Sequence, residues 1–372
     1  MNKITNNQLY RLIVAHCIEI IREPAVLFWG ILFPILMAWG LGIAFTQKHD
    51  EIHKIAIVKY SGTEHDSGKS KLLGFLEKNV RTKNGQFTVE LKNSKLGNSS
   101  LIFFESTWND AYTMLKKGNI NVIVEDHTND IKYHFDPASS DAQKIYHQIA
   151  DMLDNGINYY SANQETIKPL TISGTRYIDF LIPGLLAMGI MMSCTWGISY
   201  TIIERRSKKL LRRMVATPMK KSNFLIALIT ARVAMNIFEA LILILFSWLY
   251  FDIHFQGSIM ALIAVFITGN IAFSGLSILI SSHTANSEIG NGIINAVVTP
   301  MMVLSGIFFS YHNFPEWSLP VIRNLPLTML ADSIRSIFNE GVGFAEVYRE
   351  ILVLLATGIV SFVIGLKIFK WY

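Results

Sequence analysis

The side chains that could carry out chemistry do not form a recognisable catalytic motif. The stretch Gly62–Ser70 resembles a phosphate-binding loop, but it has five residues before its Gly-Lys-Ser where that motif has four. A surface turn is the better interpretation. The sequence contains no His-Glu-x-x-His, Cys-x-x-Cys or Gly-x-Ser-x-Gly motif, and its histidines lack metal-ligand spacing. The sequence therefore predicts no catalytic residue, no metal site and no cofactor bound by this chain.

The densest group of charged side chains lies in the stretch Glu204–Lys221, which holds eight Lys or Arg residues and one acid. On one side, residues 180–203 contain no Asp, Glu, Lys or Arg, and on the other, residues 224–251 contain only Arg232 and Glu239. A basic block between two membrane-length apolar runs is typical of a cytoplasmic loop. A loop that only sets membrane orientation is the simpler alternative to a binding function.

Arg232 and Glu239 are candidates for a functional role because charges inside a membrane are expensive and usually face a bundle interior. They are seven residues apart, so they share a helix face without forming a direct pair. We consider Glu239 and Asn236 candidates for a pathway or an interface. The alternatives are that Arg232 reaches back to the membrane surface and that Glu239 only hydrogen bonds to a neighbouring helix.

The overall composition indicates an integral membrane protein. The 372 residues are 51% hydrophobic and 16% charged, against about 25% charged residues in soluble domains. The net charge of +5 does not indicate nucleic-acid binding, because membrane orientation explains the basic block. Cys17 and Cys194 lie in different apolar surroundings, so no disulfide is expected.

The hydrophobic pattern predicts a helical membrane protein with six transmembrane helices and a mixed α/β extracytoplasmic domain between the first two. Residues 1–23 form an amphipathic helix that suits the membrane interface, and Pro24 ends it. The expected spans, each near the roughly 20 residues needed to cross, are 24–47, 176–203, 224–250, 258–280, 289–309 and 351–369. Residues 177–372 thus form a five-helix region, and both termini are expected in the cytoplasm.

Residues 48–176 have short apolar runs between polar turns, which is typical of a compact α/β domain. Strands are expected at 54–60, 87–91, 120–124 and 131–135, and helices at 70–80, 108–117 and 141–160.

Residues 310–345 are apolar but interrupted by prolines, including Pro315, Pro320 and Pro326. Prolines free backbone carbonyls, which are tolerated at membrane depth only where protein or a water-lined cavity covers them. Two short re-entrant helices on the outer side and a plain exterior loop are both consistent with this pattern.

These features together resemble the membrane subunit, or permease, of an ABC transporter of the ABC-2 type, over nearly the whole chain. The residues that carry the resemblance are Glu204, Arg205, Arg206, Thr217 and Pro218 in the basic loop, followed by Ser305-Gly306, Phe308-Phe309, Pro315, Trp317, Pro326-Leu327-Thr328, Asp332 and Arg335. The sequence departs from the family pattern at Ser310, at Met329 and at Ser207-Lys208-Lys209.

The resemblance implies a bacterial inner-membrane exporter with a coupling helix in loop 204–221, formed with Leu210 and Leu211 and bound to a separate ATP-binding subunit. ATP and Mg²⁺ would bind that partner. Two permease copies, identical or paralogous, would meet through spans one and five near Ser305 and Gly306, surrounded by membrane lipid and without nucleic acid. Pro315, Trp317, Pro326, Asp332 and Arg335 would form the re-entrant segment.

Three other functions are considered. A mechanotransmission subunit would move the external domain without translocating a substrate, but such proteins usually have four spans. A membrane-anchored receptor would leave the basic loop and the paired prolines without a role. A membrane enzyme would need a catalytic constellation, which the sequence lacks.

Overall fold

The computed structural model describes residues 8–46, 51–59, 71–80, 82–83, 86–91, 99–126, 131–137, 139–156, 176–216 and 219–371. The chain divides into two compact units, one formed by residues 1–46 with 172–372 and the other by residues 47–171. Each unit has its own hydrophobic core.

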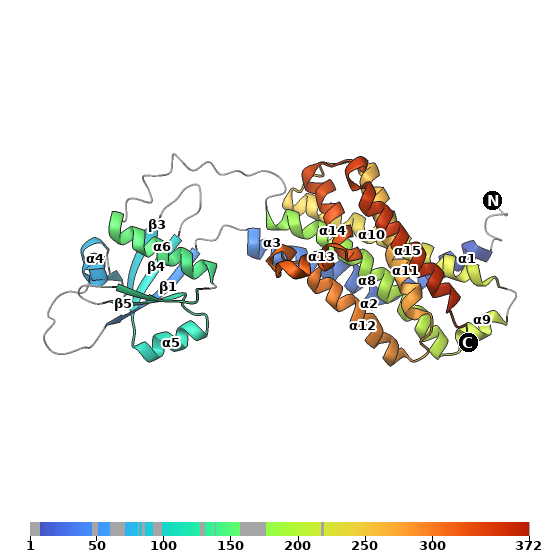
Figure 1. Ribbon diagram of the computed structural model, residues 1–372, viewed down its shortest axis with the longest axis horizontal. Coiled ribbons are helices and arrows are strands. Elements are labelled where there is room, and N and C mark those ends of the chain that lie inside the picture. Colours follow the sequence, from blue (N-terminus) through green and yellow to red (C-terminus); the bar gives the residue numbers. More distant parts are fainter. Residues whose placement is uncertain are drawn as a thin grey trace. The chain divides into compact units, whose positions relative to one another are not determined.

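The smaller unit is a six-stranded mixed sheet covered by helices on both faces (Figure 1). The strands are β1 (Glu51–Lys59), β2 (Thr82–Lys83), β3 (Gln86–Leu91), β4 (Ser99–Glu105), β5 (Val122–Asp126) and β6 (Ile131–His134), in the spatial order β2-β3-β4-β1-β5-β6. Strand β1 pairs in parallel with β4 and β5, and the outer pairs are antiparallel.

The core of this unit follows from the alternation of side chains along β1. Ile55 and Ile57 face α4 (Lys71–Asn79) and α6 (Ser140–Asn155), whereas Ala56 and Val58 pack against α5 (Trp108–Lys116) on the other face. A strand covered on both faces is apolar at successive positions, as β1 is. Gly118, with φ of 69°, follows α5 at the predicted helix end.

The expected strands and helices of this unit are confirmed, with two omissions. The sequence did not predict the two-residue edge strand β2, nor β4, which lies beside β1 at the centre of the sheet. Its residues Ser99–Glu105 form a short apolar run that periodicity cannot distinguish from a buried helix segment. Helix α6 ends at Asn155, because Gly156 has a φ of 83°, so the expected helix 141–160 is interrupted at residue 156; residues 157–160 lie outside the described residues.

The larger unit is helical. It contains α1 (Gln8–Ile21), a first apolar helix in three parts (α2, Pro24–Leu27; η1, Phe28–Leu32; α3, Phe33–Thr46), α8 (Tyr177–Ser207), α9 (Leu210–Val215), α10 (Lys221–Phe251), α11 (Ile259–Ser281), α12 (Ser287–Leu304), short helices η3 (Tyr311–Asn313), η4 (Glu316–Ser318), α13 (Leu319–Arg323), α14 (Pro326–Arg335) and η5 (Ser336–Glu340), and α15 (Phe344–Lys367).

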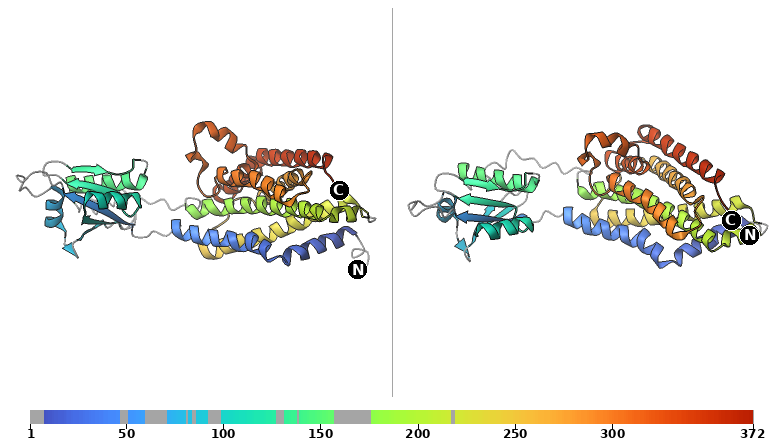
Figure 2. Two further views of the ribbon diagram at one scale, coloured as in Figure 1. Left: turned by 90° about the horizontal axis from the view of Figure 1, so that it is seen from below. Right: turned by 60° about the horizontal axis from the view of Figure 1, so that its bottom comes forward.

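Helix α8 is the central element of this unit. Of the helices apolar enough to cross a membrane it is the most buried, with 78% of its apolar stretch inside the unit, against 17% for the first helix and 28% for α15. Figure 2 shows α8, in green, running between the first helices in blue and α12 in orange. Motion of α8 would therefore reach most of the other helices.

Among the described residues, five helices are long and apolar enough to cross a membrane: 24–45, α8, α10, α11 and α15. The predicted count of six spans is not confirmed. The expected fifth span corresponds to α12, an 18-residue helix that carries Glu288, Asn291 and Asn295 in its first half. It ends at Leu304 rather than Phe309, because Gly306 takes a left-handed conformation with φ of 68°. Helix α15 begins seven residues before the predicted Ile351.

Residues 310–345 form short helices rather than an irregular loop. Pro320 and Pro326 stand in the first turns of α13 and α14, where a missing N–H is tolerated. Helix α14 packs one apolar face against α8.

Candidate functional site

The basic loop is a short helix on a sharp turn. Lys209 adopts a left-handed conformation with φ of 57°, which separates the end of α8 from α9. Leu211 is buried in the main core, whereas Leu210, Arg212 and Arg213 are exposed. Leu211 and the partly buried Met214 thus anchor α9, and its exposed side can contact a partner.

Arg205 connects the end of α8 to α1. Its Nη2 donates a hydrogen bond of 2.6 Å to Glu19 Oε2 and lies 3.4 Å from Nδ1 of His16. Its guanidinium also lies over the ring of Phe224, 5.5 Å from the centroid. His16 and Glu19 are themselves 3.1 Å apart. The contacts hold α1 against the beginning of α10 and the end of α8.

The surroundings of α1 shift the pKa values of two of its residues, His16 and Glu19. Burial, together with the nearby charge of Arg205, lowers the pKa of His16 below its usual 6.5. Burial opposes ionisation of Glu19, but the hydrogen bond and the charge of Arg205 outweigh it and lower the pKa of Glu19. At neutral pH the pair is therefore a neutral imidazole beside a carboxylate bound to Arg205.

Arg206 points in the opposite direction and is 4% exposed. Its guanidinium donates to four backbone carbonyls, from Nη1 to Ser281 O (2.5 Å) and Thr284 O (2.6 Å), from Nη2 to Ser282 O (3.2 Å) and from Nε to Lys370 O (2.8 Å). Carbonyls at the end of a helix lack intrahelical partners. Arg206 thus caps the end of α11 and joins it to the C-terminal segment.

The remaining predicted residues of the loop have different positions. Glu204 pairs with Lys208 one turn later at 2.7 Å on the surface. Thr217 and Pro218 lie outside the described residues. Beside the loop is a hollow of ≈ 520 Å³ lined by Arg206, Lys209, Leu211, Arg212, Val215, Lys221 and Trp371. Its rim combines basic and apolar side chains.

Polar residues inside the helical unit form a second group. Asn236 Nδ2 donates to Asn270 Oδ1 at 2.6 Å and lies 3.4 Å from Cys194 Sγ, which joins α10, α11 and α8. Ser274 Oγ lies 3.8 Å from the same sulfur. Asn236, predicted as an interface or pathway residue, is therefore part of an interhelical network within one chain.

The two buried charged residues of α10, Arg232 and Glu239, do not pair with each other, and each packs on a glycine of a neighbouring helix. Arg232 lies against Gly197 of α8, and the carboxylate of Glu239 lies against Gly30 of η1. A methyl group at either glycine would overlap the charged group. Arg232 is 6% and Glu239 7% exposed. Neither glycine could be identified from the sequence, because their partners are distant in sequence.

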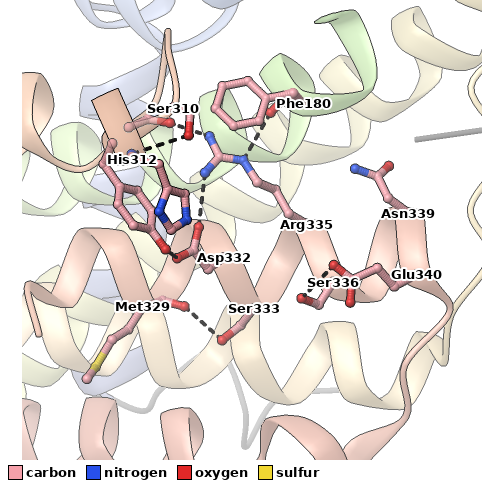
Figure 3. A network of polar contacts seen from close by, with 12 residues as sticks. Phe180, Ser310, His312, Met329, Asp332, Ser333, Arg335, Ser336, Asn339 and Glu340 are labelled. Atoms are coloured by element: carbon pink, nitrogen blue, oxygen red, sulfur yellow. Dashed lines mark hydrogen bonds and ion pairs between the residues drawn. The ribbon is translucent and has the colours of Figure 1, made fainter. Parts of the chain in front are cut away.

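A third polar network holds the opposite end of α8 (Figure 3). Arg335 donates to Asp332 Oδ1 (3.1 Å), to Phe180 O (3.2 Å) and to Gly306 O (2.6 Å), and its guanidinium lies 3.8 Å from the centroid of the Phe180 ring. The hydroxyl of Tyr311 donates to Asp332 Oδ2 at 2.9 Å. The predicted pair Asp332 and Arg335 thus connects α14 to α8 and to the end of α12.

The other residues predicted for this region are distributed between core and surface. Ser305 is fully buried, and Gly306 supplies its carbonyl to Arg335. Pro326 begins α14, Pro315 precedes η4, and Trp317 is 81% exposed. Phe180 and Tyr311 were not predicted, because neither belongs to a family motif.

Comparison with known proteins agrees with this architecture. The chain is 23% identical over 208 residues to proteins named "Probable multidrug ABC transporter permease YbhS" from Escherichia coli strain K12 and from Escherichia coli O157:H7, an alignment that covers 53% of this chain and 55% of either relative. The chain thus spans about half the length of the curated relatives it matches. Residues 24–367 match the family described as ABC-2 family transporter protein. Because that match covers nearly all of a chain with several membrane-length apolar helices, the protein belongs to the ABC-2 family of transporters, as a multi-pass membrane permease.

Proposed function

We propose that the chain is the membrane subunit of an ATP-driven exporter, coupled through the loop 204–221 to a separate ATP-binding subunit that binds ATP and Mg²⁺. The observation that carries the proposal is the pair Arg205 and Arg206. From one point at the end of α8, they connect the loop to α1, to the end of α11 and to the C-terminal segment. A displacement of α9 would therefore be transmitted to several helices together.

The exposed side of α9 is the proposed contact with the ATP-binding subunit. Leu210, Arg212 and Arg213 are exposed there, next to the hollow of ≈ 520 Å³. Aliphatic and guanidinium groups suit a partner cleft with an apolar centre and an acidic rim. The name of the Escherichia coli relatives suggests that the substrates are small drug-like compounds.

The basic loop supports the proposed orientation, in which α9 and both termini lie in the cytoplasm and the α/β unit lies outside the inner membrane. The test uses a Cys17→Ser background with single cysteines at the exposed positions Asn109 and Ser207. An impermeant thiol reagent should label position 109 from outside and position 207 only after permeabilisation. Labelling of both from the same side would contradict the orientation.

The coupling role is tested with Arg213→Glu on the exposed side of α9 and Arg349→Glu on the exposed surface of α15 as the matched control. The ATP-binding subunit should co-purify with the control and the unaltered protein but not with Arg213→Glu. In proteoliposomes, efflux of a fluorescent dye and ATP hydrolysis should be lost together. If Arg213→Glu retains assembly and ATP-dependent efflux, the loop only sets orientation.

Two copies of the permease are expected to form the transport path, because α12 buries only Gly290, Ile294 and Val298 and leaves much of its length exposed in a single chain. Crosslinking of a single cysteine at the exposed Ile293 of α12 should give a dimer in membranes. A monomer alone would contradict this arrangement.

A further inference from the structure

Between the first apolar helix, α8, α10 and α11 lies a small, partly open cavity. It is lined by polar groups of Glu239 and Asn236 and by the apolar residues Gly30, Pro34, Leu185, Leu186, Gly189, Ile190, Ala240, Leu243 and Phe266. Its volume is ≈ 20 Å³. A cavity needs about 10–15 Å³ measured in this way to hold one water molecule. The space is therefore large enough for one water molecule and too small for a drug-like ligand.

Two buried oxygen atoms of residues that line this cavity lack a hydrogen-bond partner among the described residues. They are Oε1 of Glu239 and Oδ1 of Asn236. Both side chains are more than nine-tenths buried, at 7% and 2% exposed. Unsatisfied buried acceptors are costly in an apolar environment.

The orientation of the Asn236 amide is fixed by its neighbours. Asn270 uses its Nδ2 to donate to Phe266 O, so its Oδ1 is the atom that faces Asn236. Only Nδ2 of Asn236 can donate to that oxygen. The Oδ1 of Asn236 must therefore be the free acceptor, and exchanging the amide atoms would break the 2.6 Å bond.

We propose that this cavity is a binding site for one water molecule, which donates one hydrogen bond to Glu239 Oε1 and the other to Asn236 Oδ1. Two free acceptors match the two O–H groups of a water molecule. Gly30 belongs to the π-helical turn η1 and lines the cavity beside the Glu239 carboxylate. A larger side chain at this position would overlap that carboxylate. The water would join two side chains of α10, of which Glu239 packs on Gly30 of the first helix and Asn236 belongs to the network with α11 and α8.

Gly189 provides a sharp test of this proposal. It lines the cavity, and a Cβ atom built on it would meet no heavy atom within 4 Å. Gly189→Ala should displace the water without a steric clash. Gly189→Ser should displace it too but return one O–H donor. Gly40 is an exposed glycine of α3 whose Cβ would also meet open space, and its Ala and Ser variants are the matched controls.

Thermal unfolding of the full chain in nanodiscs should place Gly189→Ala below the unaltered protein, with Gly189→Ser recovering part of the loss. At Gly40 the alanine variant should be at least as stable as the serine variant, because alanine favours the helix. Equal stability of Gly189→Ala and the unaltered protein, or a serine variant no better than alanine, would overturn the proposal.

High-resolution cryo-electron microscopy of the unaltered full chain gives an independent measurement that does not depend on the variants folding. We expect a density peak within hydrogen-bond distance of both Glu239 Oε1 and Asn236 Oδ1. The proposed site would be overturned if both side chains were well resolved and no peak lay between them. It would also be overturned if the Glu239 and Asn236 side chains were in direct contact with each other.

Discussion

Arg206 should contribute more to the stability of this protein than any exposed arginine of the basic loop. Arg206→Met keeps most of the side-chain length but removes donors to four backbone carbonyls at 2.5–3.2 Å. A hydrogen bond from a charged donor contributes about 1.5–3 kcal/mol. The total is reduced because the substitution also removes the cost of burying a charge.

We therefore expect Arg206→Met to lower the free energy of unfolding by about 2–4 kcal/mol. At roughly 2–4 °C per kcal/mol for a domain of about 150–250 residues, the midpoint should fall by about 4–16 °C. Arg206→Lys should lose about half as much, since a lysine cannot reproduce the planar fork. The lost contacts would release the end of α11 and the C-terminal segment from α8.

The assay is thermal unfolding followed by a fluorogenic thiol reagent in a Cys17→Ser background, in which the buried Cys194 reports loss of the helical core. Arg213→Met, on the exposed side of α9, is the matched control and should change stability by less than about 0.5 kcal/mol. Equal midpoints for Arg206→Met and Arg213→Met would refute the reasoning.

Three further predictions concern His16, Tyr311 and Gly30. Because the pKa of His16 is lowered in the folded state, the unfolded chain binds more protons than the folded chain below about pH 6.5. The free energy of unfolding should therefore fall as the pH drops from 7.5 to 5.5. In thermal unfolding, His16→Gln should flatten this dependence. Tyr311→Phe should cost about 1 kcal/mol, and a double-mutant cycle with Asp332→Ala should show coupling; additive losses would contradict the 2.9 Å bond. Gly30→Ala should destabilise by about 1–3 kcal/mol through overlap with the Glu239 carboxylate, and Glu239→Ala should remove most of that cost; an unchanged cost in the double variant would count against the overlap.

Local patterns predicted much of the fold because they reflect local physics. Alternation and turn residues predicted β1, β3, β5 and β6, and the apolar runs predicted α8, α10, α11 and α15. Where the pattern is ambiguous the prediction failed: β4 was missed as a short apolar run, and α12 was extended past the left-handed Gly306. The family motifs included Asp332 and Arg335 but not their partner Tyr311, which lies in η3, 21 residues before Asp332.

The sequence alone determined that this is a membrane protein of the ABC-2 permease type, since composition, the basic block and the ordered motifs are properties of the chain itself. Only the tertiary structure decided the roles of individual residues. Adjacent Arg205 and Arg206 look equivalent in the sequence, yet one lies against α1 and the other is buried in the carbonyls of α11. The reason is geometric: successive residues at a helix end point about 100° apart, and the helices that happen to lie in those two directions are set by packing across distant parts of the chain.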